Sequence, residues 1–552
     1  MSLRDDLVHA IATARDRAIA SGAIAVPADV TLPSIGMERP ANPDHGDWAS
    51  NVAMQLAPTA RTAPMRIAQT IVEHLERPAS IASVEVAPPG FLNLRLAPAW
   101  VAAQVGPILE AGAGYGHTTA ESPRRINVEF VSANPTGPLH VGNARGAFVG
   151  DVLSRVLAAA GHQVEREYYF NDFGTQVVNL GLSVLARRRG AELPEDGYHG
   201  SYVDELAAEL PADVLAAADA APDEAGMVVG RWASEQVRAG IEASLARLGV
   251  RFDVWKEEGS LHTEGWVERA VERLRAAGHV YEDEGATWFR STTFGDDKDR
   301  VIHRSNGQPT YFASDIGYVT EKFARGFDEL IYIWGADHHG TVARVRNAAG
   351  AMGYDREAVR MLLIAWVRFV RDGVEIPMSK RSGEFITLDE VLDEVGVDAA
   401  RWFFSSRAYT TGIDFDLELA KKQSNENPVY YVQYAHARAA SILRNAAAAG
   451  AGAGPDSSHT GELLQHPSEL GLVRHLLDFP DAIATAAERR ETHEVPRYAY
   501  ELASAFSAFY RDCKVLTDDA ALTSARLALV DSTRGVLANA LELLGISAPE
   551  SM

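Results

Sequence analysis

The sequence predicts a multidomain α/β protein in which a parallel-sheet domain lies between a small α+β domain and an all-helical domain. Three observations support this prediction. The chain has 552 residues, which is more than a single hydrophobic core usually organises. Strand and helix patterns alternate from about residue 113, as they do in doubly wound parallel sheets. Roughly the last 140 residues are almost entirely helical in their hydrophobic period.

Residues 1–112 form the first expected domain. Helical patterns lie near residues 2–20 and 64–76, and residues 87–93, Ala-Pro-Pro-Gly-Phe-Leu-Asn, lead into a strand. A glycine-rich segment from Gly112 to Gly116 then marks the join to the next domain.

Residues 113–390 form the second expected domain, a Rossmann-type parallel sheet with helices on both faces. Charged and alanine-rich helical stretches interrupt the alternation over about 185–280, so we expect an insertion there. The expected elements are strands at Ile126–Val131, Gln163–Phe170 and Leu330–Trp334 and helices that begin after His140 and from Thr175.

Residues 391–552 form the third expected domain, which is helical, with a loop over 446–454. Two local signals precede it. Asp372-Gly373 predicts a hairpin turn, and Thr387 with Glu390 predicts a capping box that starts a helix.

Composition excludes several classes of protein. The chain has 52 Lys plus Arg against 75 Asp plus Glu, a formal net charge of −23, so any nucleic acid must be bound by a restricted surface. Apolar runs are too short to span a bilayer and the first residues lack a secretory signal, so we expect a cytoplasmic protein without membrane contact. The single cysteine, Cys513, excludes internal disulfides and cysteine-rich zinc sites, and its apolar context predicts a buried structural thiol.

Residues 127–143, Asn-Val-Glu-Phe-Val-Ser-Ala-Asn-Pro-Thr-Gly-Pro-Leu-His-Val-Gly-Asn, predict a nucleotide site. A strand carries Glu129 toward its carboxyl end, and the prolines that follow stop the strand. A glycine-rich helix then starts near His140, and the free N–H groups of its first turn can hold phosphate.

This segment resembles the His-x-Gly-His signature of class I aminoacyl-tRNA synthetases, in the form typical of arginyl-tRNA synthetases. The resemblance implies that His140 is catalytic, stabilising charge on the α-phosphate of ATP, with Gly142 and Asn143 beside it. Asn143 stands where the family usually has its second histidine. Residues 377–383, Pro-Met-Ser-Lys-Arg-Ser-Gly, are similar to the family's second signature, in which Met378, Ser379 and Lys380 contact ATP and Lys380 assists the departure of pyrophosphate.

The same resemblance implies an arginine pocket. A guanidinium has five donors and no acceptor, so its site needs several oxygens and a flat partner. The five expected pocket residues are Glu129, Asn134, Tyr311, Asp315 and Asp337. His338 and His339 are adjacent and therefore point apart, which disfavours a shared metal, so we expect no protein-built metal site. The resemblance implies nucleotide contacts for both, with His339 in the ATP site.

The C-terminal domain resembles the family's anticodon-binding domain, and residues 44–51 resemble its additional N-terminal tRNA-binding domain. Aromatic and basic side chains suit unpaired bases and phosphates. The expected tRNA contacts are Tyr434, Arg438, Arg497 and Arg511.

The resemblance as a whole implies a cytoplasmic, monomeric enzyme that joins L-arginine to tRNA(Arg) through arginyl-adenylate, with ATP as substrate and Mg²⁺ on its phosphates. Three alternatives stay open from the sequence. A nucleotidylyltransferase would use residues 127–143 but leave both flanking domains without a role. A weakened synthetase-like RNA-binding protein would fit Asn143 and also Pro377, which stands where the family's second signature has its first lysine. A lysine-specific enzyme would also have an acidic pocket.

Overall fold

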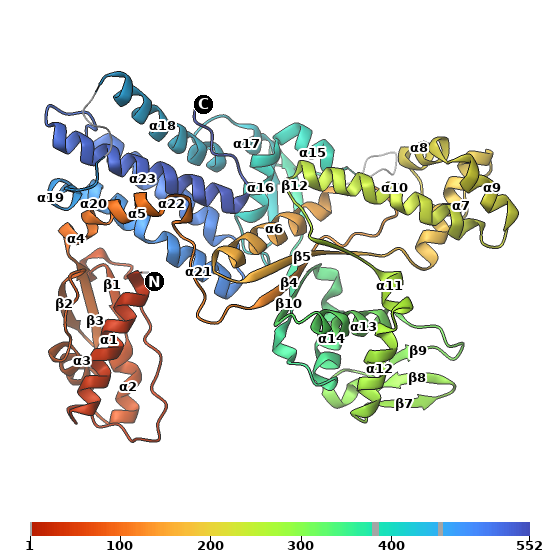
Figure 1. Cartoon of the computed structure of the whole chain (residues 1–552), viewed down its shortest axis with the longest axis horizontal. Coiled ribbons are helices and arrows are strands. Elements are labelled where there is room, and N and C mark those ends of the chain that lie inside the picture. Colours follow the sequence, from red (N-terminus) through yellow and green to blue (C-terminus); the bar gives the residue numbers. More distant parts are fainter. Residues whose placement is uncertain (1–2, 378–385, 451–455) are drawn as a thin grey trace.

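The computed structural model describes residues 3–377, 386–450 and 456–552 (Figure 1). Its centre is a five-stranded parallel sheet with the strand order β11-β10-β4-β5-β6. An N-terminal lobe, an arm of helices and a group of long C-terminal helices surround this sheet (Figure 1). The predicted fold class is therefore confirmed. In the described part of the chain, no helix combines the length and apolar character of a membrane span.

The strands expected near residues 126, 163 and 330 all belong to the central sheet. Helix α6 (Ala144–Ala159) connects β4 to β5 and lies close to the sheet, because Gly150 has no side chain where the ring of Phe130 packs. The strands β4 and β10 are neighbours, but the chain continues from β4 to β5 toward one edge of the sheet and from β10 to β11 toward the other edge. The carboxyl ends of β4 and β10 therefore mark the switch point where such sheets bind ligands. The five strands are β4 (Arg125–Glu129), β5 (Gln163–Phe170), β6 (Val254–Glu257), β10 (Glu329–Gly335) and β11 (Val359–Ile364).

The expected insertion over 185–280 does not lie wholly outside the sheet. Its first part forms an arm, in which glycines on α7 and α10 let the two helices approach closely (Figure 1). The chain then returns to the sheet, because β6 pairs with β5. A four-residue strand between charged helices has too short a pattern to be recognised from sequence. The arm helices are α7 (Thr175–Arg189), α8 (Ser201–Glu209), α9 (Ala212–Ala220) and α10 (Ala225–Arg247).

Two small sheets flank the central one, of which the sequence predicted only one hairpin turn. An antiparallel sheet, β7-β8-β9, lies with α11–α13 and α14 on one side of the molecule (Figure 1). A second sheet, β13-β12-β14, contains the hairpin at Asp372-Gly373, and both turn residues have positive φ, of 51° and 77°. The elements are α11 (Glu258–Thr263), α12 (Trp266–Ala276), β7 (Val280–Asp283), β8 (Ala286–Phe289), β9 (Arg300–His303), α13 (Tyr311–Ala324), α14 (His339–Ala351), β12 (Val367–Arg371), β13 (Val374–Ile376) and β14 (Ile413–Asp416).

The N-terminal lobe is a three-stranded antiparallel sheet, β1-β3-β2, with three helices (Figure 1). Helices α4 and α5 follow it and pack against α19, α20 and α23 of the C-terminal part, although the sequence prediction grouped them with the lobe. The elements are α1 (Leu3–Ala20), β1 (Trp48–Ser50), α2 (Val52–Ala60), α3 (Pro64–Glu73), β2 (Ile81–Ala87), β3 (Phe91–Leu96), α4 (Pro98–Ala103) and α5 (Val105–Ala111).

The C-terminal part is helical apart from β14, which pairs with β12. The capping box at Thr387 and Glu390 is present and starts α15. Cys513 is buried, and burial raises the pKa of its thiol to about 11, as expected for a structural cysteine. The expected loop over 446–454 lies partly outside the described residues. The helices are α15 (Leu388–Val395), α16 (Val397–Ser405), α17 (Leu417–Lys421), α18 (Pro428–Ala448), α19 (Thr460–Leu463), α20 (Pro467–Leu477), α21 (Phe479–Arg489), α22 (Glu494–Asp512) and α23 (Ala520–Leu544).

Candidate active site

A cleft of about 1230 Å³ opens at the carboxyl ends of β4, β10 and β11. Its walls are the loop after β4, the start of α6, the segment after β10, and residues 197–202 of the arm. Tyr202 ties the arm to the loop after β4 by donating its hydroxyl to the carbonyl oxygen of Thr136 at 2.7 Å. The cleft therefore lies at the switch point of the sheet, where a nucleotide is expected.

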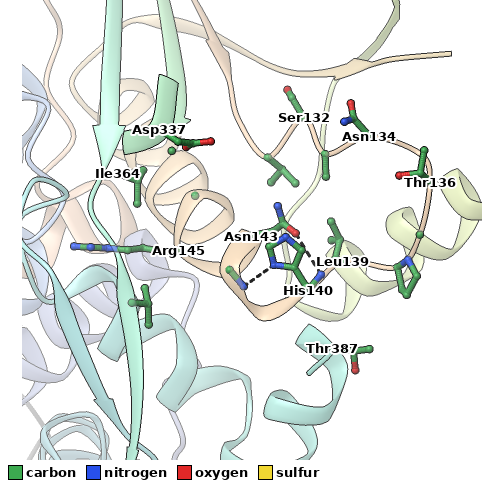
Figure 2. A pocket seen from close by; sticks show the side chains of 18 of the residues that line it. Ser132, Asn134, Thr136, Leu139, His140, Asn143, Arg145, Asp337, Ile364 and Thr387 are labelled. Carbon is green, nitrogen blue, oxygen red and sulfur yellow. Dashed lines mark hydrogen bonds between the residues drawn. The ribbon is translucent and has the colours of Figure 1, made fainter. Parts of the chain in front are cut away.

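His140 has a defined hydrogen-bond state in this cleft (Figure 2). Its Nδ1 accepts the N–H of Gly142 at 3.0 Å, and Oδ1 of Asn143 accepts the N–H of His140 at 3.3 Å. Because Nδ1 is an acceptor, the proton of the neutral ring is on Nε2. Desolvation lowers the pKa of His140 and favours this neutral form. The side chain of His140 can thus donate a hydrogen bond from Nε2. Asn143 completes the cap with its amide oxygen as acceptor. A protonated histidine at position 143, where the family usually has histidine, would have no such acceptor.

The loop that contains His140 is joined to the start of α15. Val141 donates its N–H to the carbonyl oxygen of Ile386 at 3.2 Å, and Leu388 donates to that of Leu139 at 3.1 Å. Thr387 lies between Ile386 and Leu388 in the chain and is paired with His140 in an isolated antiparallel β-bridge. Met378, Ser379 and Lys380 lie outside the described residues, whereas residues 386–388 are hydrogen-bonded to the first signature.

The backbone at the end of β4 is strained. Val131 and Ser132 have φ of 67° and 40°, in the left-handed region that β-branched residues such as valine rarely adopt. Two hydrogen bonds fix Ser132 in this conformation: its hydroxyl donates to Oε1 of Glu129 at 3.2 Å, and its Oγ accepts the N–H of Tyr169 at 3.2 Å. The turn thus fixes one oxygen of Glu129 at the carboxyl end of the sheet.

The five expected arginine-pocket residues fall into two groups. Asn134 and Asp337 line the cleft, and both side chains are exposed (Figure 2). Glu129 is buried at the end of β4, and Asp315 is partly buried on α13. Tyr311, at the start of α13, is 69% exposed, and its spacing of four residues places it on the helix face of Asp315.

Carboxyl groups gather around Asp315. Desolvation, together with the charges of Glu258 and Glu129, raises the pKa of Asp315 to about 7. Desolvation also raises the pKa of Glu129 and of Glu258. The carboxyl groups of Glu258 and Glu129 therefore both act on Asp315 in a poorly solvated site, which is the electrostatic environment that a cationic ligand would relieve.

Sequence reasoning missed two residues of this region. Glu258 follows β6 directly, and Trp366 follows β11; both stand at carboxyl ends of sheet strands, where ligand contacts are expected. Recognition of β6 as a strand would have pointed to Glu258. Trp366 lines the cleft and is 60% exposed, which leaves an aromatic surface available for a base. By contrast, His338 rather than His339 is part of the cleft lining.

The expected tRNA residues lie on α18 and α22, which pack together. The guanidinium of Arg438 lies 4.6 Å from the ring centroid of Tyr434 and 5.1 Å from that of Tyr510, so it links the two helices. Arg497 and Arg511 are mainly exposed and are paired with Glu494 and Asp512, respectively. The two helices thus present aromatic and basic side chains on neighbouring surfaces.

Within the described ranges, one group of three side chains has metal-ligand geometry, Glu491, His493 and Glu494. It lies between α21 and α22 and is not part of the cleft lining. The carboxylates of the cleft lining are Asp337 and Glu390, and Glu390 is already engaged in the cap of α15. This donor set suits Mg²⁺ that enters with a nucleotide and keeps phosphate and water ligands.

Comparison with known proteins gives matches along most of the chain. The family model "Arginyl tRNA synthetase N terminal domain" matches residues 2–96, "tRNA synthetases class I (R), catalytic domain" matches 104–192 and 231–406, and "DALR anticodon binding domain" matches 432–552. "Arginine--tRNA ligase" of Heliobacterium modesticaldum is 46% identical over 533 residues, 94% of each chain. The Frankia alni protein of the same name is 46% identical over 555 residues, 99% of each chain.

Solved structures agree with these matches. The arginyl-tRNA synthetase of Thermus thermophilus superposes with a TM-score of 0.79 at 27% identity, and the alignment covers 100% of both chains. The parallel sheet, the helix that begins at the His140 signature and the helical C-terminal domain define a class I aminoacyl-tRNA synthetase. More specifically, the chain belongs to the arginyl-tRNA synthetase family, so the resemblance found in the sequence is confirmed.

Proposed function

We propose that the chain joins L-arginine to tRNA(Arg) in two steps in the cleft at the end of the central sheet. In the first step a carboxylate oxygen of arginine attacks the α-phosphorus of ATP, and pyrophosphate leaves. In the second, a hydroxyl of the terminal ribose of the tRNA attacks the arginyl carbonyl, and AMP leaves. The observation that supports arginine as the substrate is the cluster of three desolvated carboxyl groups beside a nucleotide-type cleft.

The proposed ATP contacts follow from the cleft wall. His140 donates from Nε2 to the α-phosphate, and the N–H groups at the start of α6 add to the positive end of the helix. Gly142 lets the nucleotide approach the backbone, and Asn143 holds the His140 turn. The family resemblance, rather than the cleft wall, adds Met378, Ser379 and Lys380 and also His339, the neighbour of the cleft residue His338. In this set Lys380 supplies the cation for pyrophosphate. Trp366 offers a flat surface for the adenine ring.

The proposed arginine contacts follow from a comparison of the charged groups of arginine with the carboxyl groups near Asp315. Free arginine carries two cationic groups, the guanidinium and the α-ammonium, and one carboxylate that has to face the α-phosphorus. Glu129, Asp315 and Glu258 provide carboxylates for the cationic groups. Asn134, Asp337 and Tyr311 are proposed to orient the rest of the substrate at the cleft.

Further parts of the proposal concern the partners. Mg²⁺ would be held on the ATP phosphates, where it neutralises charge as pyrophosphate leaves. The tRNA would contact Tyr434, Arg438, Arg497 and Arg511. We propose that the enzyme acts as a monomer in the cytoplasm, and light scattering with and without tRNA checks the oligomeric state.

The test is ATP-dependent charging of total tRNA with labelled arginine and, in parallel, with labelled lysine at matched enzyme concentration. We expect charging with arginine alone. Charging with lysine would refute the assigned specificity. Binding of tRNA without charging by either amino acid would refute the enzyme and favour an RNA-binding protein. The variant His140→Ala should slow adenylate formation while tRNA affinity stays the same, which separates the chemistry from binding.

A further inference from the structure

A lysine with no exposed surface lies beneath the carboxyl cluster. Lys322 is on α13, and its Nζ is 2.7 Å from Oε2 of Glu129 and 3.6 Å from Oε1 of Glu167. The same Nζ lies 4.0 Å from the ring centroids of both Tyr318 and Tyr332. Two carboxylates and two aromatic rings thus form an ammonium cage, and the chain fills it with its own lysine.

The two carboxylates of the cage differ in their other partners. Glu167 has a second cation, because Nη2 of Arg325 lies 2.5 Å from its Oε2, and it also accepts the hydroxyl of Tyr318. These groups offset its burial, and the pKa of Glu167 is lowered overall. For Glu129 the ion pair within the described residues is with Lys322. Glu129 therefore depends on Lys322 more than Glu167 does.

The contacts of Glu129 also fix its direction. Oε2 is held by Lys322, and Oε1 accepts the hydroxyl of Ser132 at 3.2 Å. An ionised carboxylate has about four acceptor positions, so these two bonds orient the group and leave it able to bind a cation. Burial raises the pKa of Glu129 and favours a neutral acid, whereas the charge of Lys322 and its hydrogen bond act against this and favour the carboxylate.

We propose that Lys322 is a positioning residue for arginine, which keeps Glu129 ionised and directed toward a cationic group of the substrate. Lys322 itself touches neither substrate nor reacting atoms, because its ammonium is enclosed by the cage. The inference rests on the proposed function, since it requires Glu129 to contact arginine. Without the ammonium, Glu129 takes up a proton and can no longer pair with a cation.

The first test replaces the charge and keeps the volume. In Lys322→Met we expect the Kd for arginine, measured by calorimetry, to rise 10-fold or more while the Kd for ATP changes less than twofold. Lys256→Met is the matched control, because Lys256 is a largely buried lysine of the same region whose partners are Glu264 and Glu321. Its arginine affinity should stay within twofold of the original protein. Equal losses of arginine and ATP affinity in Lys322→Met, or no loss, would overturn the proposal.

The second test restores the charge without the side chain. Lys322→Ala leaves a cavity beside Glu129, and ethylammonium chloride should recover arginine affinity in a saturable manner. Tetraethylammonium chloride at the same ionic strength should have no such effect, because it is too large for the cage. The variant can be folded with the amine present and titrated to lower amine concentrations, which covers the case in which Lys322→Met does not fold. Absence of recovery in folded Lys322→Ala would refute the positioning role.

Failure of this inference differs from failure of the proposed function. If the original protein neither binds arginine nor charges tRNA with it, the proposed function is wrong, and the role of Lys322 is overturned with it. If the original protein charges tRNA with arginine and Lys322→Met binds arginine normally, the function stands and the role of Lys322 is wrong.

Discussion

Two buried ionic sites in this protein are built on opposite principles. At the first, Arg401 on α16 has no exposed surface, and its guanidinium donates to Oδ2 of Asp151 at 2.7 Å and to the carbonyl oxygens of Leu248 and Leu544, each at 2.9 Å. At the second, the carboxyl groups of Glu258 and Glu129 lie near Asp315, and the pKa values of all three acids are raised. We call the first site the junction and the second the carboxyl cluster.

The junction has fixed acceptors for its cation. Leu248 and Leu544 lie at the carboxyl ends of α10 and α23, where the helix dipole is negative, and Asp151 is on α6. Gly545 follows α23 with a φ of 66° and lies against the guanidinium, so a side chain there would displace it. One arginine thus joins the arm, the C-terminal helices and the helix of the His140 signature.

The difference shows how to distinguish structural charges from substrate-binding charges. The junction satisfies its buried charge within the chain, so removal of a partner should reduce stability. The carboxyl cluster leaves charge to be neutralised by a ligand, so removal of a carboxylate should reduce binding and relieve repulsion.

The largest expected effect is at the junction. In Arg401→Met, Asp151 and two helix ends lose a buried charged donor, and we expect the free energy of unfolding to fall by about 3–5 kcal/mol. Urea denaturation followed by circular dichroism measures it. A loss below about 1 kcal/mol would show that the junction is not satisfied in the way that its distances indicate.

The next effect has the opposite sign on stability. Asp315→Asn keeps the shape but removes the charge, and the loss of a charge-assisted contact should weaken arginine binding by about 2 kcal/mol, roughly 30-fold in Kd. Ionisation of Asp315 lowers the free energy of unfolding, because its pKa is raised in the folded protein. Without arginine, the variant should therefore have a higher free energy of unfolding at pH 8 than the original protein. Calorimetry and urea denaturation give the two numbers. Lower stability together with normal binding would make Asp315 a structural residue.

The sequence was informative where a residue acts through its neighbours in the chain. The helix start near His140, the Asp372-Gly373 hairpin and the Thr387 capping box are local, and all three are present where they were predicted. Lys322 and Arg401 could not be found in this way, because Glu129 is 193 residues from Lys322 and Asp151 is 250 residues from Arg401. Only the folded chain brings these charges together.

A smaller effect concerns pH. The pKa of Asp315 is about 7 without ligand, above its usual 3.8. Ionisation of this group therefore does not affect the free energy of unfolding below about pH 4, and it lowers that free energy by its full amount above about pH 7. Arginine needs the ionised form and should release a proton on binding near pH 7. We expect the Kd to be about tenfold higher at pH 6 than at pH 8. Calorimetry in two buffers of different ionisation enthalpy measures the proton release, and its persistence in Asp315→Asn would assign it to Glu258, whose pKa burial also raises.

The smallest effect tests whether position in the junction matters more than charge. Arg155 also donates to Oδ2 of Asp151, from Nε at 2.9 Å, but its side chain is 28% exposed. Because water can replace this partner and Arg401 remains, Arg155→Met should lower the free energy of unfolding by less than about 1 kcal/mol. The same urea denaturation that measures Arg401→Met gives the comparison, on the same carboxylate. Equal losses in the two variants would mean that the number of cations near Asp151 decides stability, and that burial of Arg401 against the two helix ends adds nothing.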